Sequence, residues 1–133
     1  MSEWEKWKTF NVAGVTFKNH QRDKYTRLEM ISHYCSHVSK FVLERESENP
    51  FDGNAIKVKQ VFKNGGSVCL GHVPNSAKKR LANELAPILD AGGTIELIFG
   101  RKFIDEATGE CKGLQMRYKI LADCMRYCNN PLR

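Results

Sequence analysis

Residues 43–58 read LERESENPFDGNAIKV, and this stretch decides the fold. Its centre, residues 47–54, has the composition of a turn, because proline fixes φ while asparagine, aspartate and glycine tolerate left-handed conformations and bond their own backbone. On both sides apolar and polar residues alternate, over residues 38–44 before the turn and residues 55–62 after it. A period of two is typical of a strand with one buried face. The stretch therefore predicts two strands joined by a turn.

The sequence on either side predicts more strands of the same kind. Asn64-Gly65-Gly66 is a strong hairpin signal directly after the second strand. Residues rich in β-branched and aromatic side chains, or in regular alternation, predict four further strands, at residues 9–17, 67–73, 94–104 and 112–121. The last two flank a turn at residues 105–110.

Two helices are predicted between the strands. In residues 19–34, Tyr25, Leu28 and Ile31 recur at three-residue steps and form one apolar face. A second helix over residues 75–90 has Asn75 or Ser76 as its cap, with a kink or a division into two short helices expected at Pro87. The order β-α-β-β-β-α-β-β, with mostly hairpin connections, favours a mainly β (α+β) fold, a small antiparallel barrel or curled sheet with one or two packed helices.

Three motifs together closely resemble the HIRAN family. They are Val12-Ala13-Gly14-Val15, the core N-P-F-D-x-N-A-I at residues 49–56, and Leu70-Gly71-His72-Val73-Pro74. Ala82, residues 85–90 and Gly92 also fit the family pattern, so the resemblance covers about residues 10–121. The family occurs fused to helicase-like chromatin remodellers and as standalone microbial proteins, and the resemblance implies an OB-like six-stranded antiparallel barrel. We expect an N-terminal lead at residues 1–8, the HIRAN domain at residues 9–123 and a tail at residues 124–133.

The resemblance also implies a site for the 3′-hydroxyl end of single-stranded DNA. In the remodeller members two aromatic rings stack on the terminal bases, and an aspartate after the second ring accepts a hydrogen bond from the hydroxyl. Carried over by position, the rings are Phe17 and Phe51 and the aspartate is Asp52. Asn49 falls where the family uses an asparagine near the terminal nucleotide. A base stack contributes about 1–3 kcal/mol, and a carboxylate accepts from a free hydroxyl but repels a phosphate.

The chain departs from the remodeller pattern near these residues. Phenylalanines stand where those members have tyrosines, so stacking is retained without the phenolic hydrogen bonds. Thr16 stands where they have an arginine that contacts phosphate. The insert at residues 19–34 and the residue before it carry cations that are expected to supply phosphate contacts instead, namely Lys18, Arg22, Lys24 and Arg27.

Composition and charge agree with a small DNA-binding module. The 133 residues are 41% hydrophobic and 27% charged, with a net charge of +6, which favours attraction to polyanions. No apolar run approaches the roughly 20 residues that span a bilayer, and residues 1–6 lack the layout of a secretory signal. We expect a cytoplasmic protein, nuclear if the source is eukaryotic, that is monomeric, acts in DNA repair or replication and has a repair or helicase protein as a partner.

Two other functions stay open on the sequence alone. One is a protein-interaction adaptor built on the same barrel, which would not need two rings beside a basic surface. The other is a small metal-dependent enzyme that processes nucleic acid, with a carboxylate cluster formed by Glu44, Glu46, Glu48 and Asp52. The chain has no G-x-x-x-x-G-K-S/T loop for ATP. We expect a domain that is not an enzyme, with no catalytic residues and no cofactor.

The cysteines and histidines suggest one further site. His33, Cys35 and His37 alternate, and Cys124 and Cys128 lie near the C-terminal end, so a zinc site can be drawn. The set lacks the paired CxxC spacing of structural zinc sites. An odd number of cysteines indicates reduced thiols. We expect no bound metal and five free thiols, at Cys35, Cys69, Cys111, Cys124 and Cys128.

Overall fold

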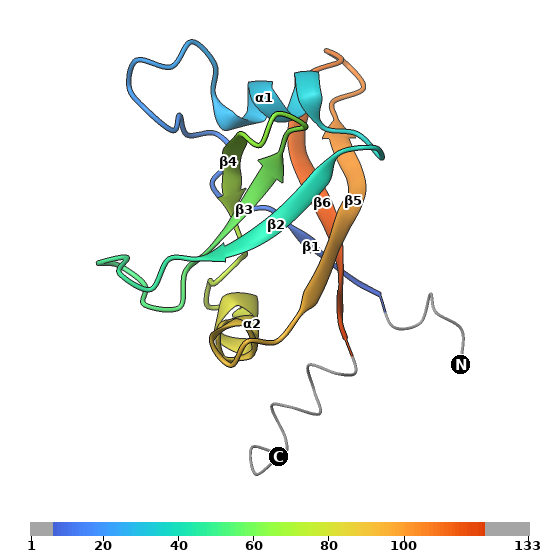
Figure 1. Cartoon of the computed structure of the whole chain (residues 1–133). Helices are drawn as coiled ribbons and strands as arrows, with labels where there is room; N and C mark the ends of the chain where they lie inside the picture. The colour runs from blue at the N-terminus through green and yellow to red at the C-terminus, as the bar shows by residue number, and fades with distance from the viewer. Residues whose placement is uncertain (1–6, 122–133) are drawn as a thin grey trace.

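Six strands and two helices make up residues 7–121, the part of the chain that the computed structural model describes (Figure 1). Their order is the predicted β-α-β-β-β-α-β-β. The elements are β1 (Lys8–Asn11), α1 (Arg27–Tyr34), β2 (Lys40–Arg45), β3 (Ile56–Val61), β4 (Ser67–His72), α2 (Leu81–Asp90), β5 (Ile95–Ile104) and β6 (Cys111–Ile120). The predicted tail with Cys124 and Cys128, and residues 1–6 of the lead, lie outside the described residues. Neither described helix is long and apolar enough to cross a membrane.

The strands form two three-stranded antiparallel sheets, ordered β1-β6-β5 and β2-β3-β4. At one edge the sheets are joined by a single bridge, in which Ala13 and His72 exchange two backbone hydrogen bonds of 2.8 Å. At the other edge β2 lies beside β5, without backbone pairing between these two strands in residues 7–121. The mainly β, OB-like fold class is therefore confirmed, but the six-stranded barrel is not closed.

The short first strand explains the open seam at the bridged edge. The predicted strand over residues 9–17 is too long, since β1 ends at Asn11 and the chain turns at Gly14, whose φ of 74° suits glycine. Val12 still donates to the Leu114 carbonyl at 2.9 Å, and Ala13 then forms the bridge to β4. Within residues 7–121, one pair of backbone hydrogen bonds therefore crosses between the sheet of β1 and β4.

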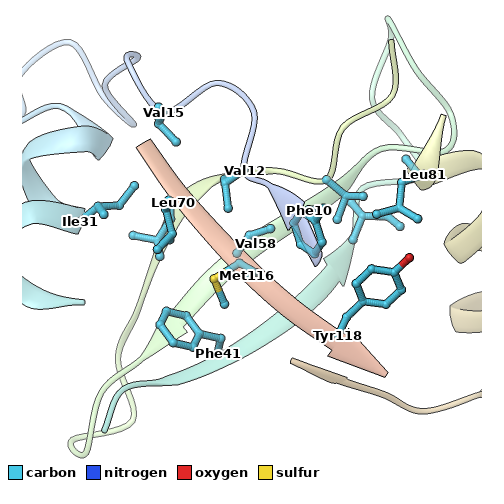
Figure 2. Close-up of a cluster of buried hydrophobic side chains, with 14 of the residues drawn as sticks. Phe10, Val12, Val15, Ile31, Phe41, Val58, Leu70, Leu81, Met116 and Tyr118 are labelled. Atoms are coloured by element: carbon cyan, nitrogen blue, oxygen red, sulfur yellow. The ribbon is translucent and has the colours of Figure 1, made fainter. Parts of the chain in front are cut away.

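Apolar side chains from both sheets and both helices fill the space between the sheets (Figure 2). Met116 of β6 and Leu70 of β4 are fully buried, and alternate residues of β3 face the same interior. Ile31 of α1 and Leu81 of α2 lie toward opposite ends of this core (Figure 2). The two helices thus cover the two ends of the sheet pair.

Helix α1 is shorter than the predicted helix over residues 19–34. Thr26 begins it through a capping box, in which the Thr26 hydroxyl accepts the Glu29 backbone N–H at 3.2 Å and the Glu29 carboxylate accepts the Thr26 N–H at 3.1 Å. This reciprocal pair fixes the start of the helix at Arg27. Residues 19–26 consequently form a loop, which we call the insert loop.

Helix α2 also begins later than predicted, at Leu81 instead of residue 75. The cationic run of residues 78–80 therefore precedes the helix, and Lys79 reaches the Thr9 carbonyl of β1 at 3.2 Å. The helix continues through Pro87, where a kink is predicted, as one element. Pro87 is three residues from the helix end, so the missing N–H removes a single backbone hydrogen bond near a terminus.

Candidate functional site

The side chain of Asn49 stabilises the turn between β2 and β3 by hydrogen bonds to residues of the turn itself. Its Oδ1 accepts the backbone N–H groups of Phe51 at 2.8 Å and Asp52 at 3.1 Å, and its Nδ2 donates to the Glu46 carboxylate at 2.8 Å. An asparagine that accepts from the residues after it forms a side-chain-capped turn. The structure thus places Asn49 beside Phe51 and Asp52, the other two predicted site residues of this turn. The hydrogen bonds of the Asn49 amide stabilise the turn.

Arg45 joins the same turn to helix α2. Its guanidinium forms a bidentate pair with Asp90 at the end of α2, at 2.8 and 3.2 Å, and donates to the carbonyls of Ala55 and Gly53 at 2.9 and 3.0 Å. Hydrogen bonding across this pair raises the pKa of Arg45 and lowers that of Asp90. Because a bidentate pair has fixed geometry, the turn is anchored to α2 as well as to its strands.

The two predicted stacking rings are both exposed. The Phe51 side chain, in the turn, is 96% exposed, and the Phe17 side chain is 65% exposed. The backbone at Phe17 is fixed, since its carbonyl accepts the Arg27 N–H at 2.9 Å. A ring this exposed contributes little to the core, because the hydrophobic contribution scales with the area removed from water. Both rings are therefore available for contact on a fixed backbone.

Asp52 is half-buried within a cluster of asparagines. Its Oδ1 accepts the Asn54 N–H at 2.9 Å and its Oδ2 accepts the Asn75 amide at 2.7 Å. Asn83 of α2 accepts from both Asn54 and Asn75, at 2.8 and 3.2 Å. The Asn75 Oδ1 is buried and has no hydrogen-bond partner within the described residues. A carboxylate has about four acceptor positions, so Asp52 can accept a further donor.

Glu46 links this turn to the seam between the sheets. Its Oε1 accepts from Asn49 and lies 3.1 Å from the His72 Nε2, while the backbone of His72 pairs with Ala13. Ala13 precedes the turn that carries the first ring, so hydrogen bonds connect the two ring-bearing segments. Both segments project on the left in Figure 1, the first in blue above and the second in green below.

The carboxylate of Glu46 is strongly stabilised as an anion. Hydrogen bonds from the Asn49 amide, the His72 imidazole and the Lys57 ammonium lower the pKa of Glu46 from 4.5 to about 2. The Lys57 Nζ lies 3.2 Å from the carboxylate. Because the folded-state pKa is below the unfolded value, this contribution to stability is present above about pH 4.5 and is lost as the pH falls toward 2.

We expect Glu46→Gln to flatten the acid dependence of stability. The wild-type free energy of unfolding should fall between pH 5 and about pH 2, and the variant, which cannot titrate at this position, should show a smaller fall over the same range. Urea unfolding at a series of pH values measures both curves. Glu106→Gln, in the exposed turn at residues 105–110, is the control and should keep the wild-type slope. Equal slopes for all three proteins would contradict this role for Glu46.

A cleft of about 600 Å³ lies between the insert loop and the face of β3 and β4 that points away from the core. Lys24 and Arg27 line it from the insert side, and Lys57 and Lys59 from β3, with the carboxylates of Asp23 and Glu46. Two of the predicted phosphate-binding residues thus lie at one cleft. The other two, Lys18 and Arg22, are exposed and do not line it.

Three of the four carboxylates of the hypothetical nuclease cluster, those of Glu44, Glu46 and Asp52, have partners in the structure. Glu44 pairs with Lys59 at 2.9 Å, Glu46 is held as described, and Asp52 accepts from two neighbours. In the part of the chain that the structure describes, no three His, Cys, Asp or Glu side chains are grouped as metal ligands. The absence of a metal and of catalysis stays a prediction.

The described cysteines, Cys35, Cys69 and Cys111, carry free thiols. Burial raises the pKa of Cys35 to about 12, and its thiol donates to the Gln60 side-chain oxygen at 3.4 Å. Cys35 is therefore an unreactive residue of the core. The other two cysteines of the drawn zinc site lie outside the described residues.

Sequence reasoning missed the residues that support the turn. The Arg45–Asp90 pair joins residues 45 positions apart, and the Asp52–Asn75 contact spans 23 positions. Glu46 lies in the stretch of residues 43–58 and His72 in the motif at residues 70–74, which is a signal that both positions matter, but neither pattern indicates that the two side chains meet.

Fold and site together define a small β-rich module with two exposed rings on anchored turns. No family model and no curated protein matches the chain. Among solved structures, the HIRAN domain of human HLTF is similar, with a TM-score of 0.50 and 22% sequence identity over 95% of this chain and 85% of that one. The chain therefore has the fold of a HIRAN domain, as its motifs predict.

Proposed function

We propose that this chain is a DNA-binding module that captures the end of a single strand with a free 3′-hydroxyl. The observation that carries the proposal is the pair of exposed rings, Phe17 and Phe51, on backbones that hydrogen bonds hold in place. Because the backbone that carries each ring is already ordered, no ordering of the backbone is needed when a base stacks on the ring. The HIRAN-type fold and the quoted motifs support the same function, including a role in DNA repair or replication.

Asp52 supplies the preference for an end. It lies next to Phe51 in the chain, and the contact with Asn75 at 2.7 Å orients its carboxylate. A terminal hydroxyl donates to this carboxylate, whereas a terminal phosphate is repelled by its charge. The two rings bind without regard to base identity, since every base presents a π-face.

Fluorescence anisotropy with four oligonucleotides tests the function. The ligands are a single strand with a 3′-hydroxyl, the same strand with a 3′-phosphate, a blunt duplex, and a duplex with a single-stranded 3′ overhang. We expect the first and fourth to bind best. Equal affinity for all four would reduce the function to non-specific electrostatics, and binding to none would contradict it.

Asp52→Asn should narrow the difference between the 3′-hydroxyl and the 3′-phosphate strands more than it lowers affinity for the hydroxyl strand. The amide keeps an acceptor oxygen but removes the charge that repels phosphate. Asp105→Asn is a matched control, because Asp105 also caps a turn, by accepting the Ala107 N–H at 2.8 Å. A hydroxyl preference that survives in Asp52→Asn, or that falls equally in both variants, would exclude Asp52 from end recognition.

A further inference from the structure

We propose that the cleft beneath the insert loop holds the nucleotides that lead up to the two stacked bases, so that the insert lengthens the bound strand. The inference rests on the proposed function and adds to it a second contact region and a direction for the strand. Its basis is the position, shape and charge of the cleft.

The cleft begins where the first ring-bearing segment ends. Asn19, two residues after Phe17, lines it, and Arg27, whose backbone N–H bonds the Phe17 carbonyl, forms part of its wall. Its lining also includes Glu46 and His72, which connect to the turn that carries Phe51. The lining of the cleft is therefore connected to both ring-bearing segments.

The direction of the strand follows from the chemistry of Asp52. If the 3′-hydroxyl lies at Asp52, the terminal base lies on the adjacent Phe51 ring and the preceding base on Phe17. The next nucleotides toward the 5′ side then leave from Phe17 toward Asn19 and Arg27, which line the cleft.

The cleft is preformed. The Asn19 amide donates to the Cys69 carbonyl of β4 at 3.0 Å, which fastens the insert loop across the sheet. The Arg27 guanidinium donates to the Asn19 side chain at 2.9 Å and to the Gly14 carbonyl at 3.1 Å. An arginine held in this way keeps its charge in one place, and a site that needs no ordering on binding loses less affinity.

The lining suits a nucleotide. Four cationic side chains face two carboxylates around the cleft. Tyr25, Met30 and Val68 supply apolar surface beside these charges. Phosphate oxygens take hydrogen bonds and charge from lysine and arginine, while a base needs an apolar or aromatic face. Neither a purely acidic nor a purely apolar ligand matches this combination.

Calorimetric titration with unlabelled thymidine oligonucleotides of two, four, six and eight residues, each with a free 3′-hydroxyl, tests the inference. We expect wild-type affinity to rise beyond the dinucleotide. The slope of log K against log salt should steepen by about 0.7 for each further phosphate that is contacted.

The variant Lys24→Gln/Lys59→Gln removes two cleft cations, one of them from an ion pair with Glu44. Lys40→Gln/Lys112→Gln is the matched control, because both lysines are exposed, neither lines the cleft, and Lys112 leaves an ion pair with Glu110. The cleft variant should bind the dinucleotide like the wild type but lose the gain on longer strands, with a salt slope shallower by up to about 1.4. The control should keep the wild-type length dependence.

Each failure has its own signature. A wild type that binds two and eight nucleotides with equal affinity and equal slope overturns the inference and leaves the proposed function standing. Equal losses in the two double variants also overturn it, because general charge would then explain the binding. A wild type that binds none of the strands overturns the proposed function itself.

Discussion

Replacing Phe51 by alanine should weaken binding to a single strand with a 3′-hydroxyl by about 1–3 kcal/mol, which is roughly fivefold to 150-fold in Kd. The free energy of unfolding should stay within about 0.5 kcal/mol of the wild type, as for surface substitutions that remove no buried contact. Both expectations follow from one observation, the 96% exposure of this ring on a turn whose backbone is held by Asn49. Anisotropy measures the first quantity and urea unfolding the second.

Two controls separate stacking from its alternatives. Tyr34→Ala removes another exposed ring, 53% exposed and at the end of α1, and should leave DNA affinity unchanged. Phe41→Ala removes a ring that is only 8% exposed and should cost about 3–5 kcal/mol of stability, with affinity per folded molecule retained. If Phe51→Ala instead behaves like Phe41→Ala, with loss of stability and unchanged binding, the ring is structural and the proposed site is wrong.

Phe17→Ala belongs in the same experiment, although the Phe17 ring is less exposed than the Phe51 ring. Its ring is 65% exposed, and part of it therefore rests on the protein. Phe17→Ala gives a second measurement of base stacking, since the proposed path of the strand places one base on each ring.

The local part of the fold was predictable because its determinants are local. Alternation over β3 and the Asn64-Gly65-Gly66 turn specify a hairpin without reference to the rest of the chain, and the observed strand Ile56–Val61 is one residue shorter at each end than predicted. The start of α1 was missed because a capping box at Thr26 overrides an apolar periodicity that extends before it. Closure of the barrel depends on how two distant segments approach, and periodicity carries no information about that.

In the candidate site, too, the locally determined features were predictable and the long-range contacts were not. Its rings stand on turns that composition identifies, so their positions could be named from the sequence. The contacts that anchor these turns could not be predicted from the sequence, because they are long-range. Asn19 binds Cys69 of β4 across 50 positions, and Arg45 beside the β2–β3 turn binds Asp90 of α2 across 45 positions. The cleft is a product of these long-range contacts. Of the four cations predicted to contact phosphate, only Lys24 and Arg27 line the cleft, together with lysines of β3.

Gly71, a residue of the third motif, allows the close approach of the two sheets at the Ala13–His72 bridge. It lies in β4, one residue before the bridge between His72 and Ala13, with a φ of 151°. A Cβ at this position would collide with the Ala13 carbonyl oxygen and come within 2.6 Å of Cγ1 of Val12. The backbone of the β1 sheet can therefore approach β4 only because residue 71 has no side chain.

Gly71→Ala should consequently destabilise the protein by about 1–3 kcal/mol, the usual cost of forcing extra atoms into a packed site. The clash is with backbone and cannot be relieved by a rotamer change, so the Ala13–His72 bridge should open first, and amide exchange at these two residues should lose its protection. His72 also contacts Glu46, so the opening should loosen the turn that carries the exposed ring and reduce DNA affinity along with stability. Gly53→Ala is the control, because a Cβ there meets no atom within 4 Å and the Gly53 φ is not positive, and it should change the free energy of unfolding by no more than about 0.5 kcal/mol. A Gly71→Ala protein as stable as the wild type, with the bridge amides still protected, would show that the seam tolerates a wider separation and that the close approach does not hold the two sheets together.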